Sequence, residues 1–193
     1  MKHKKQNILD YISDYKKGIL KFPLLDSYTW SDEKILDLFD SIKKGYPIGS
    51  ILFWDNYVLD GLQRLSIIIG SLLHPDKTTK NENMLRINVV YDLMDDNFKI
   101  MKNEDLEYFQ IPIYKLIDGK DFFNFKKMLI EKNRNEFDTL SNKYEEMSLT
   151  IQQYEIPSIN VSTSLSDVII IIKRLDLNKS SKFIEDLNSI NIK

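Results

Sequence analysis

The segment formed by residues 48 to 73 constrains the fold more than any other part of the chain. Two strand-like runs, 48–54 and 57–59, are separated by Asp55-Asn56, which suits a two-residue hairpin turn. The second run leads directly into Asp60-Gly61. Apolar residues then repeat at helical spacing: Leu62, Leu65, Ile68, Ile69 and Leu72. A hairpin that runs straight into a buried helix predicts strands and helices packed around one core.

The rest of the pattern predicts an α+β fold with a small mixed sheet. A first helix begins near Ile8 and ends near Gly18, a short strand covers 19–22, and Ser31 caps a second helix. Further predicted elements are a second hairpin over 85–101 around Asp95-Asp96-Asn97, an extended piece at 111–113, a long amphipathic helix within 122–153, a strand at 155–161 and a helix at 165–175.

Composition excludes several classes of function. The chain of 193 residues is 42% hydrophobic, enough for a sizeable core. It has no cysteine, which rules out disulfides, thiolate catalysis and cysteine-bound zinc. Its two histidines, His3 in a basic start expected to be frayed and His74 before a proline, do not form a metal-ligand cluster. The net charge of -2 gives no global attraction to nucleic acid. No apolar run approaches the roughly 20 residues that span a bilayer, so we expect a cytoplasmic protein with no membrane partner.

The five residues Asp60-Gly61-Leu62-Gln63-Arg64 combine groups that suit phosphate chemistry. A carboxylate can hold Mg²⁺, a glycine lets the backbone approach closely, and an arginine makes charge-assisted contacts. A helix that begins here also directs its free N–H groups toward an anion. The structural alternative is a capping box, in which Asp60 caps the helix, Gln63 reaches back and Arg64 is solvated.

Four segments resemble, in order and spacing, the start of the N-terminal domain family of GmrSD-type restriction enzymes. They are Tyr28-Thr29-Trp30-Ser31, Leu38-Phe39-Asp40-Ser41-Ile42, Tyr46-Pro47-Ile48-Gly49-Ser50-Ile51-Leu52-Phe53-Trp54 and Asp60-Gly61-Leu62-Gln63-Arg64-Leu65. The resemblance is specific over residues 19–73 and fainter over 156–178. It implies a ParB/sulfiredoxin-like fold over one domain, residues 1–193. We expect a motif-bearing core at about 19–117, a helical annex at about 121–153, and a return strand and helices at 155–193.

The resemblance also implies binding and hydrolysis of a nucleoside triphosphate, often GTP, in systems that restrict modified DNA through a separate nuclease domain. Asp60 would be the catalytic acidic residue that holds Mg²⁺, Gln63 would orient water or phosphate, and Arg64 would stabilise phosphate charge. Gly61 and Leu62 would shape the nucleotide-binding loop. Arg174 would reach the same pocket from the C-terminal part of the chain.

Three departures from the family pattern bear on activity. Leu62 replaces a glutamine, Leu25-Asp26 replaces a Gln-Arg pair, and the segment after Arg174 lacks a glycine turn. The chain carries no histidine-rich metal site of its own, so we expect no nuclease activity without a partner. A sulfiredoxin-like reductase is excluded because that chemistry needs a cysteine. Two hypotheses remain: an Mg²⁺-dependent NTPase that regulates restriction, and a non-catalytic DNA- or protein-interaction module on the same scaffold.

Overall fold

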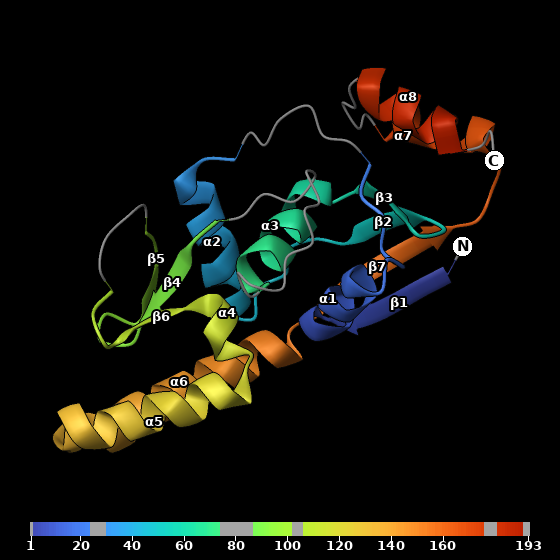
Figure 1. Ribbon diagram of the computed structural model, residues 1–193. Helices are drawn as coiled ribbons and strands as arrows, with labels where there is room; N and C mark the ends of the chain where they lie inside the picture. Colours follow the sequence, from blue (N-terminus) through green and yellow to red (C-terminus); the bar gives the residue numbers. More distant parts are fainter. Residues whose placement is uncertain (1, 24–29, 74–86, 102–105, 176–180, 191–193) are drawn as a thin grey trace.

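A computed structural model describes residues 2–23, 30–73, 87–101, 106–175 and 181–190, and the chain has an α+β fold (Figure 1). The described strands form two small sheets, not the single sheet that the sequence indicated. One sheet has four strands in the order β1-β7-β2-β3, and the other has three in the order β5-β4-β6. In Figure 1 the central helix α3 (Leu62–Leu72) lies between the two sheets.

The four-stranded sheet brings the N-terminal strand and a strand from the C-terminal part of the chain together with the hairpin. Its members are β1 (Lys2–Asn7), β7 (Glu155–Val161), β2 (Ile51–Trp54) and β3 (Tyr57–Asp60). β7 runs parallel to β2 and antiparallel to β1, so the sheet is mixed as predicted. The expectation of a frayed start is wrong, because all six residues of β1 pair with β7, beginning at Lys2 opposite Asn160.

The hairpin is confirmed, with Trp54 opposite Tyr57 and Asp55 at a φ of 50° in the turn. Its first strand begins at Ile51, three residues later than expected. The predicted strand over 19–22 is wrong, since this segment makes only an isolated bridge between Lys21 and Tyr57.

Three helices contribute buried side chains to the core. In α1 (Ile8–Lys16), the Asn7 side chain caps the start by accepting from the Asp10 N–H at 2.8 Å. In α2 (Asp32–Lys43), Ser31 caps as predicted by accepting from the Lys34 N–H at 3.3 Å. Helix α3 is buried along almost its whole length, and the small residues Ser66, Gly70 and Ser71 are buried there among leucine and isoleucine side chains.

The second hairpin is also confirmed, and it forms its own sheet. β4 (Val89–Asp92) pairs with β5 (Asn97–Ile100) and with β6 (Gln110–Pro112). The carboxylate of Asp92 is buried and accepts from the Met94 and Asp95 amides, Lys99 and Gln110. Burial alone would raise the pKa of this carboxyl, but the hydrogen bonds outweigh it and lower the pKa below its ordinary value.

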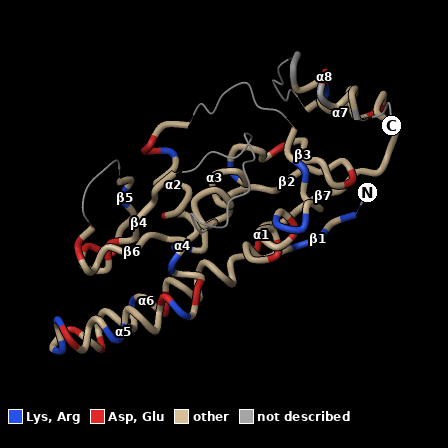
Figure 2. The backbone as a smooth tube through the Cα atoms, in the orientation of Figure 1, with Lys and Arg blue, Asp and Glu red and all other residues tan. Residues whose placement is uncertain are grey.

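The helical annex is a pair of helices that projects from the body (Figure 1). The short helix α4 (Ile113–Leu116) leads into α5 (Gly119–Lys132), and a 3₁₀ turn (Arg134–Glu136) leads into α6 (Phe137–Gln153). The predicted helix after Arg134 is confirmed as α6. The helical residues before it form the separate helix α5, because the chain reverses at Asn133. Charges of both signs are interspersed along the pair (Figure 2).

Two helices follow β7. The predicted helix over 165–175 is confirmed as α7 (Leu165–Arg174), capped by Ser164, and α8 (Ser181–Ile190) packs against it. The Trp54 indole donates to the Thr163 carbonyl at 2.9 Å and ties the start of this segment to the hairpin. Within the described ranges, no helix has the length and apolar character needed to cross a membrane.

Candidate functional site

The segment Asp60–Arg64 lies where β3 ends and α3 begins. Gly61 is the N-cap residue of α3, with φ +78° and ψ 11°, a left-handed conformation that glycine adopts without strain. A Cβ at this position would collide with the Ile51 side chain. The motif glycine is therefore required both by the turn and by the close packing of β2 against it.

Gly61 occupies the N-cap position of α3, and a glycine has no side chain that caps a helix. The capping-box alternative assigned this position to Asp60, which lies one residue before it. A helix N-terminus directs first-turn N–H groups and the positive end of its dipole outward, which favours an anion.

The side chain of Arg64 holds the segment Ile48–Ser50, which precedes β2, and we call this arrangement the clamp. Its guanidinium donates to the Ile48 carbonyl through Nη1 and to the Ser50 carbonyl through Nη2 at 3.3 Å. Gly49, between the two acceptors, has φ +87°, and a Cβ there would overlap Arg64 Nη1. β2 therefore begins only at Ile51, because the preceding carbonyl groups bond to a side chain and not to a neighbouring strand.

Tyr154 holds the same segment from the other side. Its hydroxyl donates to the Tyr46 carbonyl, and burial raises its pKa although Ile48 and Arg64 act in the opposite direction. Sequence reasoning gave no role to Gly49 or Tyr154. Gly49 lay within the third resembling segment and could have been singled out, whereas a tyrosine that binds a backbone carbonyl has no sequence signal.

The acidic residue lies beside the clamp. Asp60 Oδ2 is 3.9 Å from Arg64 Nη2, and the two side chains are 41% and 19% exposed. The carboxylate therefore remains open to solvent while the guanidinium is mostly covered. Gln63 lies in the first turn of α3, next to Leu62. The Leu62 side chain is only 3% exposed, so it packs in the core and leaves its backbone as the part that could meet a ligand.

Other predicted site residues lie apart from this turn. Arg174 is exposed at the C-terminal end of α7. Within the described part of the chain it makes no hydrogen bond or ion pair with Asp60 or Arg64. Leu25-Asp26, Tyr28-Thr29 and His74 lie outside the described residues. No group of three or more acidic or histidine side chains that could hold a metal ion occurs among the residues described.

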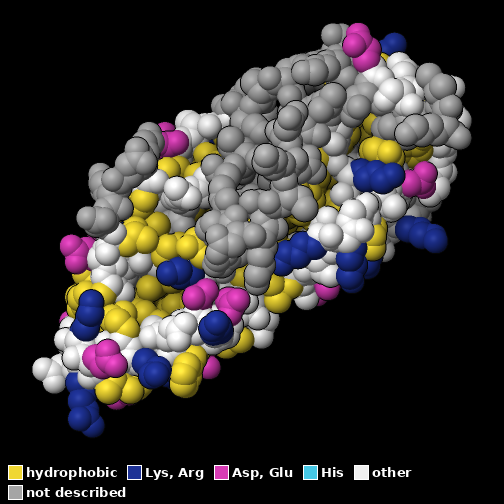
Figure 3. Space-filling view, in the orientation of Figure 1, with side chains coloured by type: hydrophobic (Ala, Val, Ile, Leu, Met, Phe, Trp, Pro, Cys, Tyr) yellow, Lys and Arg dark blue, Asp and Glu magenta, His cyan; other side chains and the backbone are white. Residues whose placement is uncertain are grey.

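Charge around the described surface is mixed. On the face shown in Figure 3, basic and acidic side chains alternate with apolar ones.

The structure has a cavity of about 390 Å³ at the end of the first sheet that carries Lys2, Phe53 and Asn160. A smaller cavity of about 180 Å³ lies beside Tyr91 and Asp96. Neither of these two cavities is lined by residues 60–64.

The sequence matches a known protein family. The sequence model described as the GmrSD restriction endonuclease, N-terminal domain, matches residues 8–190, nearly the whole chain. No curated protein matches the chain.

Proposed function

Because the chain belongs to the GmrSD restriction endonuclease N-terminal domain family, we propose that it binds a nucleoside triphosphate and regulates a restriction system directed at modified DNA. The supporting observation is the junction at Gly61, where the start of α3 lies beside a solvent-accessible carboxylate. The family match supports the restriction context. The ParB/sulfiredoxin-like topology and the single-domain organisation stay predictions.

The residues at the junction fit a nucleotide with Mg²⁺. First-turn amides of α3 would bind phosphate oxygens, and the helix dipole would favour their negative charge. Asp60 would repel a bare phosphate, so binding at this place calls for a divalent cation between them. Mg²⁺ commonly uses one or two protein carboxylates together with substrate phosphates, and Asp60 fits that role. Bound Mg²⁺ would neutralise phosphate charge.

Arg64 would act chiefly by positioning. A guanidinium has five N–H donors, and the two carbonyl contacts use only part of this capacity. Arg64 would hold the Ile48–Ser50 segment against the start of α3 and keep a remaining donor for phosphate. Gln63, in the first turn, would orient a phosphate or a water molecule. We assign Arg174 a supporting role only if α7 approaches the nucleotide when it binds.

The test is calorimetric titration of the protein with ATP, GTP, CTP and UTP, with and without Mg²⁺. We expect at least one triphosphate to bind more tightly with Mg²⁺, and Asp60→Asn to remove that dependence. Asp138→Asn, an exposed carboxylate on the distant helix α6, is the matched control and should bind as the wild type does. Absence of affinity for all four triphosphates with Mg²⁺ would refute the proposal.

A second candidate is the non-catalytic interaction module, favoured by the buried Leu62 side chain. A glutamine at this position would offer a polar contact, whereas Leu62 packs in the core. The carbonyl contacts of Arg64 likewise give that residue a structural reason to be present. Turnover of any triphosphate by the purified protein, abolished in Asp60→Asn, would exclude this candidate.

A further inference from the structure

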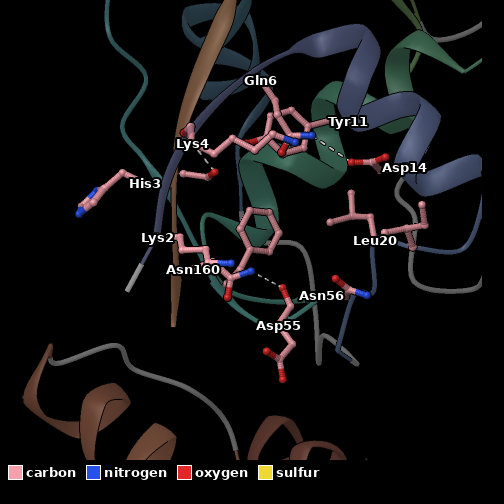
Figure 4. Close-up of a pocket in the computed structure, with 13 residues that line it drawn as sticks. Lys2, His3, Lys4, Gln6, Tyr11, Asp14, Leu20, Asp55, Asn56 and Asn160 are labelled. Atoms are coloured by element: carbon pink, nitrogen blue, oxygen red, sulfur yellow. Dashed lines mark hydrogen bonds between the residues drawn. The ribbon is translucent and has the colours of Figure 1, made fainter. Parts of the chain in front are cut away.

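The larger cavity lies at the opposite end of the β2–β3 hairpin from Asp60, beside the Asp55-Asn56 turn (Figure 4). Its volume of about 390 Å³ is near the lower end of the roughly 300–1,000 Å³ typical of ligand pockets. The lining residues that matter below come from β1, α1, β2 and β7: Lys2, Lys4, Tyr11, Phe53 and Asn160. The cavity is thus a second site, separate from the helix start.

The strand register explains why the cavity exists. Asn160 is opposite Lys2 on β1 and opposite Phe53 on β2, so these three residues share one face of the sheet. Helix α1 covers this face farther along, where the Tyr11 hydroxyl donates to the Ile156 carbonyl at 3.3 Å. Within the described ranges, α1 is the helix that contributes lining residues to the cavity, through Tyr11 and Asp14.

Polar groups in the cavity have unused binding capacity. Asn160 Nδ2 donates to the Asp55 carbonyl at 2.7 Å, which fixes its amide, but its buried Oδ1 has no hydrogen-bond partner within the described part of the chain. A buried acceptor left unpaired is destabilising, and a ligand donor would satisfy it. Across the same described ranges, the Lys2 and Lys4 ammonium groups also make no hydrogen bond or ion pair.

The acidic residues in the lining leave these lysines available. Asp14 accepts from Gln6 at 3.0 Å. The Asp55 carboxylate accepts from Ser162 at 3.2 Å, and Figure 4 shows it directed away from Asn160. In the same view His3 points away from the other lining side chains, as the alternation along β1 requires. The open end of the cavity is therefore cationic above an apolar floor formed by Phe53 and Leu20.

We propose that this cavity binds a phosphomonoester of mononucleotide size. Its phosphate lies between Lys2 and Lys4, and an N–H of its planar ring donates to Asn160 Oδ1. A phosphomonoester carries about -1.5 to -2 charges at neutral pH, whereas a carboxylate carries a single negative charge. Two lysines therefore neutralise a phosphomonoester more closely than a carboxylate. The ring packs on Phe53, whose own ring stacks with Tyr11 at 6.3 Å. The ligand is either a free mononucleotide or a terminal nucleotide of a DNA strand, because both present this chemistry.

The test uses the full chain with any affinity tag at its C-terminus, so that Lys2 is undisturbed. Calorimetric titrations with AMP, GMP, CMP and TMP are compared with inorganic phosphate alone. We expect one or more mononucleotides to bind, and the double variant Lys2→Gln/Lys4→Gln to weaken binding at least about tenfold. Lys5→Gln is the matched control, because Lys5 lies on the same strand and faces the other side. It should bind as the wild type does.

Two further measurements make the outcome decisive. Ile19→Trp, at a rim position that is 44% exposed, fills the cavity without removing a charge and should abolish binding. A 5′-phosphorylated hexathymidylate that competes with TMP assigns the ligand to a DNA end, and failure to compete assigns it to a free nucleotide. The proposal is overturned if no mononucleotide binds at millimolar concentration, if phosphate alone binds as tightly, or if Lys5→Gln weakens binding as much as the double variant.

Discussion

Replacing Gly49 by alanine should destabilise the protein through two separable effects. The first is backbone strain, because an L-residue at φ +87° costs roughly 1–2 kcal/mol. The second is displacement of Arg64, since the new Cβ would overlap its Nη1 atom. Hydrogen bonds from a charged group contribute about 1.5–3 kcal/mol each when buried, and the 19% exposure of Arg64 reduces this. We therefore expect a total loss of about 2.5–4 kcal/mol.

A control variant and a double-mutant cycle separate the two effects. Gly45 has φ +68° with nothing within 4 Å of the position that a Cβ would take, so Gly45→Ala should report the strain alone, about 1–2 kcal/mol. In an Arg64→Met background, Gly49→Ala should fall to the same value, giving a coupling energy of about 1.5–2 kcal/mol. Free energies of unfolding from urea titrations at neutral pH measure all four variants. Additivity within about 0.5 kcal/mol, or a Gly49→Ala loss equal to that of Gly45→Ala, would refute the clamp.

Three further variants test other parts of the structure. Gly61→Ala should destabilise more than Gly45→Ala because its Cβ meets the Ile51 Cδ1 methyl, and Ile51→Val, which lacks that methyl, should partly restore stability in urea titrations. The pKa of Asp92 is lowered in the folded state, so its carboxylate stabilises the fold fully above the ordinary carboxyl pKa, and this stabilisation is lost as the pH falls through the lowered pKa. Asp92→Asn should therefore lower the free energy of unfolding at pH 7 and make that free energy decline less steeply toward pH 3 in urea titrations. Trp54→Phe loses the bond to the Thr163 carbonyl, so limited proteolysis should cut the segment between β7 and α7 faster, by about fivefold for about 1 kcal/mol.

Local patterns predicted those elements whose determinants lie within the element itself. The turn residues Asp55-Asn56 predicted the hairpin, and the apolar repeat after Gly61 predicted α3. Ser31 predicted the start of α2. β1 was missed because its sequence, KHKKQN, has no apolar alternation. Its position depends on pairing with β7, a strand from the other end of the chain, and such non-local pairing leaves no local signal.

The candidate site was predictable in its residues but not in its contacts. The five-residue motif was found, yet the partners of Arg64 are backbone carbonyl groups, which any residue supplies. Only Gly49 marks the clamp in the sequence, because a larger residue would collide with the guanidinium. The N-cap position was predicted one residue too early. The left-handed Gly61 occupies it in place of Asp60, and the spacing of the residues alone does not indicate that shift.

The clamp changes which residue can test the nucleotide hypothesis. Gly49, Gly61 and Arg64 each have a packing reason to be present, so loss of binding in their variants would not separate a ligand contact from a displaced segment. Asp60 differs, because its 3.9 Å approach to Arg64 is long and its side chain is 41% exposed. Exposed ion pairs contribute about 0–1 kcal/mol, so loss of the Arg64 contact alone should change stability little, and a urea titration of Asp60→Asn measures the stability of the variant directly. A loss of Mg²⁺-dependent triphosphate affinity in a variant of wild-type stability would then report on the ligand itself.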